Sequence, residues 1–397
     1  MKIRTRTRYR IVGSDYSAQE PRITTFLSRD PNMLRAYHEG KDLYCVIAQA
    51  IFHNSYEDNL EFYPEGTKLN IDGGEVVCGV KTHINPEGKH RRKIAKVVLL
   101  ALTYGMGVNT LAQRLDCSRD EAQVILDSFF QMFPKVRDLM DSSQKSARAV
   151  GYVEDWAGRR RHLPDISLEP YEFKAETEFN PLLECRDREN PAVEKWKREL
   201  KGAIDEFNSY RRSRDPKAEN TVELPRKTFE KIASEARKDG VEIQANSVRI
   251  AQAERQCLNA RIQGGAASLT KLSMVNIYRD RILNECMTRM LISVHDEVLV
   301  ECPVLYADRV SKRLPEVMIE TAGKYIDVPM SCDPYCVSNW YADTYSNAVQ
   351  DEYEKLCEKD RDTALKKVED NHPELPKQVV DDCVLKGKEI NLEEFDD

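Results

Sequence analysis

Two adjacent acidic residues between short apolar runs constrain the fold more than any other feature of this sequence. The runs at 290–294 and 298–301 read as strands, and His295, Asp296 and Glu297 lie between them. This pattern predicts an antiparallel hairpin with both acids at its tight turn. Like charges this close repel each other unless a cation offsets them, so the turn is a candidate cation site. An ordinary polar hairpin turn is the alternative, and the segment alone does not decide between them.

A second candidate carboxylate lies near the N-terminus. Asp15 follows a predicted short strand at 8–13 and precedes a helix predicted from Pro21 onward, since Pro is tolerated in a first helical turn. A strand end holds a carboxylate rigidly and can point it at a ligand. The alternative role for Asp15 is a helix cap. Most of the chain separates Asp15 from Asp296, so only folding could bring the two acids together.

A predicted helix at 91–104, ended by two glycines, carries a polar face. Residues at four-residue spacing share this face: Arg92, Lys96, Leu100 and Tyr104. Two cations followed by an aromatic ring suit a triphosphate followed by a base. A solvated basic face with a core leucine and tyrosine is the alternative. Further helices are predicted at about 119–132 and 135–150.

A long helix predicted at 250–274 carries hydrogen-bonding side chains at the same spacing. These are Arg255, Asn259 and Gln263. They could reach the minor-groove acceptors that every base pair displays. The small residues at 264–267 permit close approach of another backbone. Simple helix packing with satisfied amides is the alternative.

Composition excludes several classes of protein. No run approaches the ~18–20 apolar residues of a membrane span, so no membrane partner is predicted. The eleven cysteines are scattered, and Cys332 and Cys336 have no partner pair, so we predict no zinc site and a reduced, cytoplasmic setting. The net charge of −7 is uneven, because residues 341–397 hold 17 acidic and 8 basic residues. The nearly neutral remainder can still hold DNA through local cationic clusters.

Taken together and in this order, the segments resemble the family A DNA polymerases of the bacterial DNA polymerase I type, including their phage members. The resemblance rests on five segments, at 15–22, 92–105, 151–165, 254–271 and 295–297. For a phage member, the cytoplasm would be that of the bacterial host. The implied fold class is α+β and helix-rich, with a palm built on an antiparallel sheet and a fingers domain, but without thumb or exonuclease domain. The implied parts are palm at 1–28, fingers at 29–165, a charged inserted subdomain at 166–250, palm again at 251–345, and an acidic extension at 346–397.

The resemblance also implies a two-metal site. Asp15, Asp296 and the Tyr16 carbonyl would hold two magnesium ions, and the implied catalytic residues are Asp15, Asp296, Glu297 and Lys96. The implied dNTP-binding residues are Tyr16, Gln19, Glu20, Arg92, Lys96, Leu100 and Tyr104. The implied DNA-binding residues are Arg22, Arg255, Asn259, Gln263 and His295. Glu20 resembles the residue that blocks a ribose 2′-hydroxyl.

The sequence departs from the family pattern in several places. Leu100 stands where the family usually has Phe or Tyr, which puts sugar discrimination in doubt. Arg261 replaces a more usual Pro. Only 14 residues precede Asp15, so we expect the strand that presents it to need neighbours from a separate chain. That partner would supply the thumb, the N-terminal part of the palm and the exonuclease, as in a split polymerase.

Two other functions fit parts of this pattern. A non-catalytic remnant that binds DNA or organises a replisome would explain the charged insertion and the acidic tail. A single-subunit RNA polymerase shares the palm, although Glu20 and the segment at 263–265 favour the DNA enzyme. The acids and cations favour an active polymerase, because binding alone has no need for two separated metal carboxylates.

Overall fold

The computed structural model describes residues 9–71, 74–80, 82–175, 191–337, 361–371 and 373. The chain divides into two compact units. The first comprises 1–139, 155–159 and 260–397, and the second comprises 140–154 and 160–259. Two helices, α7 (Pro134–Val150) and α10 (Ser247–Arg279), contribute residues to both. Most of the predicted acidic extension lies outside the described residues.

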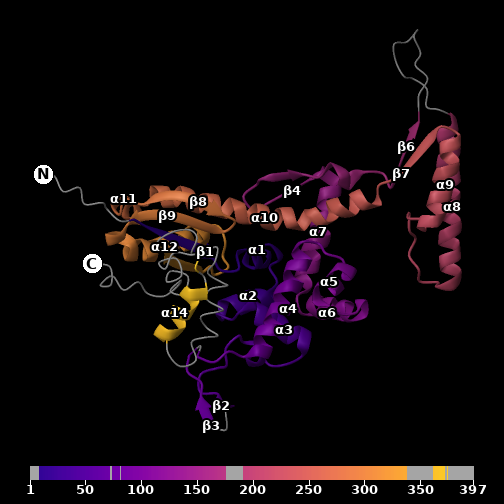
Figure 1. Ribbon diagram of the computed structural model, residues 1–397. Helices are drawn as coiled ribbons and strands as arrows, with labels where there is room; N and C mark the ends of the chain where they lie inside the picture. Colours follow the sequence, from indigo (N-terminus) through magenta and orange to yellow (C-terminus); the bar gives the residue numbers. More distant parts are fainter. Residues whose placement is uncertain are drawn as a thin grey trace. The chain divides into compact units, whose positions relative to one another are not determined.

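A four-stranded antiparallel sheet lies in the first unit, with strand order β10-β1-β9-β8 (Figure 1). Its strands are β1 (Tyr9–Tyr16), β8 (Arg289–Val294), β9 (Glu297–Pro303) and β10 (Cys332–Val337). The predicted hairpin is confirmed as β8 and β9. The expectation that β1 needs neighbours from another chain is wrong, because β9 and β10 flank it on both sides. Sequence analysis missed β10, since Pro334 argues against a strand and is accepted here only because β10 is an edge strand.

Alternate residues of β1 face helix α12 (Ala307–Gly323), which packs against the sheet. Val12, Ser14 and Tyr16 are buried on this side, and the Tyr16 hydroxyl donates to the Met318 carbonyl at 2.7 Å. Successive strand residues point to opposite faces. Asp15 therefore lies on the face turned away from α12.

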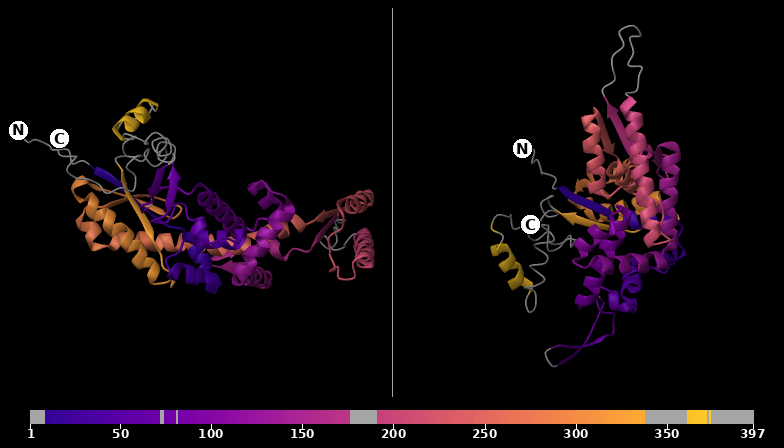
Figure 2. Two further views of the ribbon diagram at one scale, coloured as in Figure 1. Left: turned by 90° about the horizontal axis from the view of Figure 1, so that it is seen from below. Right: turned by 90° about the vertical axis from the view of Figure 1, so that its right-hand side faces the viewer.

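Helices make up most of the rest of the first unit. They are α1 (Gln19–Ser28), α2 (Pro31–His38), α3 (Leu43–Phe52), η1 (Glu57–Asn59), α4 (Pro86–Thr103), α5 (Val108–Leu115), α6 (Arg119–Met132), α11 (Arg281–Glu285), η3 (Val304–Tyr306) and α14 (Arg361–Asn371). The predicted helix at 91–104 begins earlier, because Asn85 caps it and Pro86 starts its first turn. A two-stranded ribbon, β2 (Lys68–Ile71) and β3 (Gly74–Val77), extends away from these helices (Figure 2).

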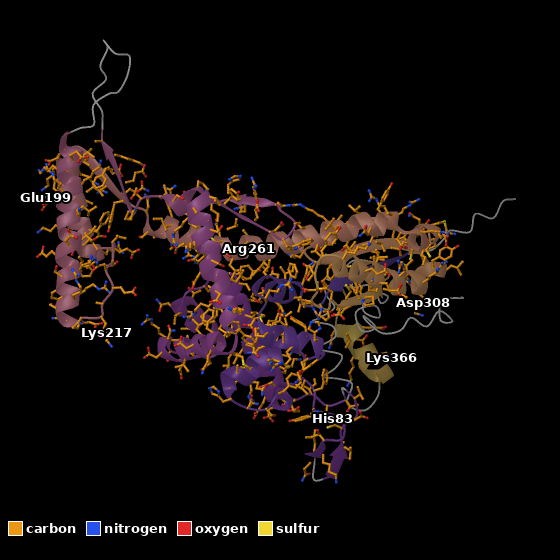
Figure 3. The ribbon with its side chains drawn as sticks, turned by 180° about the vertical axis from the view of Figure 1, so that it is seen from behind. His83, Glu199, Lys217, Arg261, Asp308 and Lys366 are labelled. Atoms are coloured by element: carbon orange, nitrogen blue, oxygen red, sulfur yellow. The ribbon has the colours of Figure 1, made fainter. Side chains whose placement is uncertain are left out.

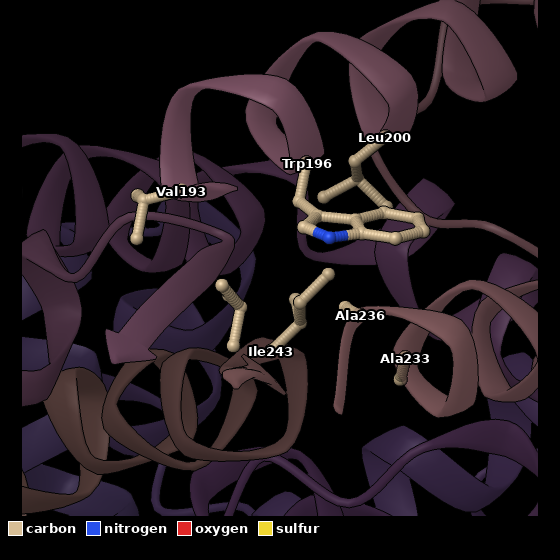
Figure 4. Packing of buried hydrophobic residues seen from close by; sticks show 7 residues of the cluster. Val193, Trp196, Leu200, Ala233, Ala236 and Ile243 are labelled. Atoms are coloured by element: carbon tan, nitrogen blue, oxygen red, sulfur yellow. The ribbon is translucent and has the colours of Figure 1, made fainter. Parts of the chain in front are cut away.

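The second unit has a core of its own. Its remaining elements are β4 (Tyr152–Glu154), β5 (Arg160–His162), η2 (Pro164–Ser167), β6 (Tyr171–Ala175), α8 (Pro191–Arg214), α9 (Arg226–Lys238) and β7 (Val241–Ala245). Trp196 and Leu200 of α8 pack with Ala236 and Ile243 (Figure 4). Charged side chains lie on the outside, among them Glu199 on α8 and Lys217 just beyond the end of this helix (Figure 3). The insertion predicted at 166–250 falls within this unit, and its boundaries stay a prediction.

No helix among the described residues combines the length and the apolarity that crossing a membrane requires.

Candidate active site

Three acidic residues lie side by side across the sheet of the first unit. Asp15 on β1 is directly opposite Glu297 on β9 and Asp333 on β10. Residues directly opposite in antiparallel strands project from the same face. Asp296 lies in the turn before β9, and its carbonyl accepts a hydrogen bond from the Tyr16 amide at 3.4 Å. The fold therefore brings the two predicted metal carboxylates together.

Negative charge is concentrated around Asp15 on this face of the sheet. Burial, followed by the charges of Asp296 and Glu297, raises the pKa of Asp15 to about 7. The Asp15 Oδ1 atom is buried and has no hydrogen-bond partner among the described residues. An unpaired buried carboxylate oxygen is costly, whereas carboxylate and carbonyl oxygens are the ligands that Mg²⁺ prefers. The donor chemistry fits a hard divalent cation, although no group of three or more His, Cys, Asp or Glu in the described part of the chain is already arranged around one point.

Tyr16 is available to a cation only through its backbone. Its ring is buried, and its hydroxyl is 2.8 Å from Ser273 Oγ in addition to its bond with Met318. Burial raises the pKa of this hydroxyl, so it stays protonated. The predicted role of the Tyr16 carbonyl is compatible with this arrangement.

Asp333 belongs to the acidic face but was missed by sequence analysis. It accepts a hydrogen bond from Ser17 Oγ at 2.5 Å, and its charge is among the causes of the raised Asp15 pKa. The sequence signal was slight, because one acid beside a proline does not indicate a strand. Only the pairing of β10 with β1 places Asp333 opposite Asp15.

The guanidinium nitrogens of Arg22 all donate hydrogen bonds to other residues of the chain. Its Nε donates to the Ser17 carbonyl at 2.8 Å and its Nη2 to Ser331 Oγ at 2.9 Å. Its Nη1 donates to the Pro329 carbonyl, and its guanidinium lies over the Tyr37 ring. Arg22 therefore joins the turn after β1 to the segment that enters β10. Its DNA-binding role stays a prediction.

Three predicted site residues converge, Glu20 from α1, Tyr104 from the end of α4 and Gln263 from α10. Gln263 Nε2 on α10 donates to the Tyr104 hydroxyl at 2.9 Å and to Glu20 Oε1 at 3.4 Å. Burial raises the pKa of Glu20, and the hydrogen bond from Gln263 partly offsets that effect. Gln19 points elsewhere, because its buried amide donates to Thr270 Oγ1 at 3.2 Å. The predicted polar face of α10 therefore reaches residues of the predicted nucleotide site.

The predicted cationic face of α4 contains two unlike cations. Arg92 Nε donates to Asp42 Oδ2 at 2.6 Å. Burial would lower the pKa of Arg92, but its bond with Asp42 and the charge of that residue outweigh burial and raise it. Lys96, one turn further on, is exposed, and no ion pair is found for it among the described residues. Leu100 is half-buried at the next position of the same face.

The remaining predicted DNA-binding residues differ in their surroundings. His295 is exposed in the hairpin turn and adopts a left-handed backbone with φ of 54°. Arg255 is exposed and Asn259 half-buried on α10, both within the second unit. The small residues at 264–267 permit a close approach, as expected, but the group that approaches Gly265 is a side chain and not a backbone. A Cβ on Gly265 would lie 2.6 Å from the indole of Trp156, whose Nε1 donates to the Gly265 carbonyl.

A family model described as DNA polymerase family A matches residues 77–180 and 202–342. These ranges make up more than half of the chain. The chain belongs to DNA polymerase family A. The segment that contains Asp15 lies outside the matched ranges, so the predicted metal-binding role of Asp15 is supported by its position beside Asp296 and Glu297 and not by the family match.

Two relatives are DNA polymerase I from Chloroflexus aurantiacus and the thermostable DNA polymerase I from Thermus aquaticus. The first is 25% identical over 332 residues, covering 84% of this chain and 24% of that protein. The second is 26% identical over 332 residues, covering 83% of this chain and 27% of that protein. This family A chain thus spans about a quarter of the length of the curated relatives it matches.

A solved structure has the same fold. The POL domain of Pol1 from M. smegmatis, in complex with DNA primer-template and dNTP, matches with a TM-score of 0.52 and 22% identity. The match covers 83% of this chain and 40% of that one. The predicted fold class, a helix-rich α+β polymerase palm and fingers, is confirmed.

Proposed function

We propose that this chain carries the nucleotidyl-transfer site of a DNA-directed DNA polymerase, which adds dNTPs to a primer 3′-hydroxyl along a template. The observation that carries the proposal is the proximity of Asp15, on the sheet, to Asp296, in the adjoining hairpin turn, whose charge is among the causes of the raised Asp15 pKa. Binding DNA has no need for such a pair, whereas phosphoryl transfer requires charge stabilisation at the reacting phosphate. Family membership and the meeting of Glu20, Tyr104 and Gln263 add support.

Two Mg²⁺ ions, when bound, would lower the pKa of the primer hydroxyl and stabilise the charge on the triphosphate. Asp15, Asp296 and the Tyr16 carbonyl would hold them, with Glu297 close by. The unpartnered Asp15 Oδ1 supports this assignment, because a cation would satisfy it.

The fingers side of the site would bind and orient the nucleotide. Arg92 would contact the triphosphate, and Lys96 would contact it and protonate the leaving pyrophosphate. Tyr104 would pack against the templating base or the new pair, and Glu20 would exclude a ribose 2′-hydroxyl. Gln19 and Leu100 would complete the surroundings of the nucleotide.

Residues from α10 and the hairpin would hold the primer-template end. Gln263 and His295 are the candidates beside the acidic face, and Arg255, Asn259 and Arg22 are the others that the family resemblance implies. Arg22 is the least suited of these, because its donors already bind the protein.

A nucleotide-incorporation assay tests this function. The purified chain is given a primer-template with Mg²⁺ and either dNTPs or rNTPs, and we expect addition of dNTPs that stops in a chelator. Preferred addition of rNTPs would instead indicate an RNA polymerase. DNA binding without incorporation of either nucleotide would support the non-catalytic remnant.

We also propose that further polypeptide covers the β8 edge of the sheet, supplied by a separate chain that carries the thumb, the N-terminal part of the palm and the exonuclease. Leu291 and Ile292 on this outer strand are exposed hydrophobic residues. An uncovered apolar edge strand is a template for pairing with another chain. Primer extension by the chain alone is the test. We expect it to add single nucleotides without processive synthesis, and robust processive synthesis without a partner would contradict a separate chain.

A further inference from the structure

Asp42, the residue before α3, binds two parts of the fingers with one carboxylate. Its Oδ1 accepts a hydrogen bond from the Tyr44 amide at 2.9 Å and so caps the helix. Its Oδ2 accepts a hydrogen bond from Arg92 Nε on α4 at 2.6 Å. The Asp42 amide in turn donates to the Tyr56 hydroxyl at 2.9 Å. These contacts hold both oxygens of the Asp42 carboxylate and the backbone of the same residue.

The hydrogen bond that Arg92 donates to Asp42 uses Nε, and it leaves the two terminal nitrogens to bind a phosphate. A guanidinium binds a phosphate best through a pair of parallel N–H bonds. Asp42 takes Nε, while Nη1 lies 4.0 Å from Glu61 Oε2, an ion pair too long for a hydrogen bond. The guanidinium also lies over the Tyr44 ring, with its carbon 5.3 Å from the ring centre. Arg92 is thereby ordered, with its side chain about one-third exposed.

We propose that Asp42 is a positioning residue for nucleotide binding, which holds Arg92 by Nε so that its terminal nitrogens are set to receive the triphosphate. The inference rests on the proposed function and assigns a new role within that site. A free arginine side chain loses much rotational freedom when it binds, and a side chain ordered beforehand loses less. The benefit should therefore appear as tighter dNTP binding, and less in the chemical step.

The opposite role for the same contact predicts the opposite result. If Asp42 competed with the triphosphate for Arg92, removing its charge would free the guanidinium and lower the KM for dNTP. The sign of the change in KM thus separates positioning from competition.

The test is steady-state single-nucleotide incorporation by Asp42→Asn. Asparagine keeps the size of the side chain and an oxygen that can cap α3, but it removes the charged acceptor of Arg92 Nε. We expect the KM for dNTP to rise about tenfold while kcat stays within about threefold. In an Arg92→Ala background the same change should have no further effect, because the residue through which it acts is gone. A general structural defect would lower kcat and would add to the loss from Arg92→Ala.

Asp280 provides a matched control in the same unit. It caps α11 by accepting from the Leu283 amide at 2.9 Å, and it also accepts from Arg313 Nη2 at 2.9 Å. Asp280→Asn therefore makes the same chemical change at a second helix-capping aspartate paired with an arginine, outside the predicted nucleotide site. We expect it to leave the KM for dNTP unchanged.

The possible outcomes separate the two proposals. An unchanged or lowered KM in Asp42→Asn, with an active wild type, overturns the positioning role alone. An equal rise in KM in Asp280→Asn also overturns it, because the effect would then follow from helix capping in general. A wild type without nucleotide incorporation overturns the proposed function itself.

Discussion

The acidic face of the sheet and the cationic face of α4 differ in the charges that surround their central residues, Asp15 and Arg92. On the sheet, Asp15 is surrounded by acids, and burial and repulsion raise its pKa to about 7. On α4, Arg92 is held by an acid of the same chain, and that bond raises its pKa in favour of the charged form. The chain thus supplies a counter-charge to Arg92 on α4, whereas the neighbours of Asp15 on the sheet add negative charge.

The largest expected effect comes from removing an acid of the sheet. Asp15→Asn or Asp296→Asn should lower primer extension on the order of a thousandfold, because the cations lose a charged ligand. DNA binding, measured by fluorescence anisotropy, should survive. Asp308→Asn is the matched control, since this half-buried residue pairs only with Lys312 among the ion pairs of the described residues. Residual extension within about tenfold of wild type would refute the metal assignment.

Removing a cation of α4 should have the next largest effect. Arg92→Ala or Lys96→Ala should lower kcat/KM for dNTP roughly a hundredfold, because each loses a charge-assisted bond to the triphosphate. For Lys96→Ala the loss should fall mainly on kcat, if this residue also protonates the pyrophosphate. Lys93→Ala provides a control on another face of the same helix. An equal loss in that variant would show that general positive charge, and no specific contact, is responsible.

A smaller effect should appear in the stability of the metal-free protein. The pKa of Asp15 rises from 3.8 to about 7 on folding, so the folded state binds a proton more tightly than the unfolded state. Stability is therefore lost as pH increases from about 4 to about 7, and Asp15→Asn should remove this loss. In a chelator, the variant's gain in Tm should grow over this window to roughly a few degrees and then level off. A gain that is independent of pH would contradict this origin.

The smallest expected effect belongs to Asp333. Its carboxylate is exposed and accepts a hydrogen bond from Ser17, and its charge contributes less to the raised pKa of Asp15 than burial, Asp296 or Glu297 does. Asp333→Asn should change kcat by only about threefold, because the charge of an exposed group is screened by solvent. A loss as large as that of Asp15→Asn would instead make Asp333 a cation ligand. Single-turnover incorporation at saturating dNTP measures this difference.

Local patterns made much of the fold predictable. The helix at 119–132 was placed correctly at both ends, because Ser118 and Glu121 form a capping box at its start. The β8–β9 hairpin followed from two short apolar runs on either side of a polar turn. Strand β10 was missed, because its proline hides a strand that only an edge position tolerates.

Regular spacing along one element is what predicted Arg92, Lys96 and Tyr104 as site residues, and their roles stay a prediction. Asp42 was missed, because it reads as an ordinary helix cap and its partner lies 50 positions further along the chain. The meeting of Glu20 with Gln263, 243 positions apart, likewise depends on tertiary packing that no local pattern records.

The pairing of β1 with a strand on each side limits which insertions and deletions its coding sequence can tolerate. Asp15 faces Glu297 and Asp333 only while the strand keeps its register with both neighbours. A shift by one residue would turn Asp15 toward α12 and bury its charge there. A substitution at Ile11 alters the contacts of one side chain. An insertion or deletion of one residue between Ile11 and Asp15 instead turns every later side chain of the strand to the opposite face. We therefore expect this stretch to vary in composition far more readily than in length.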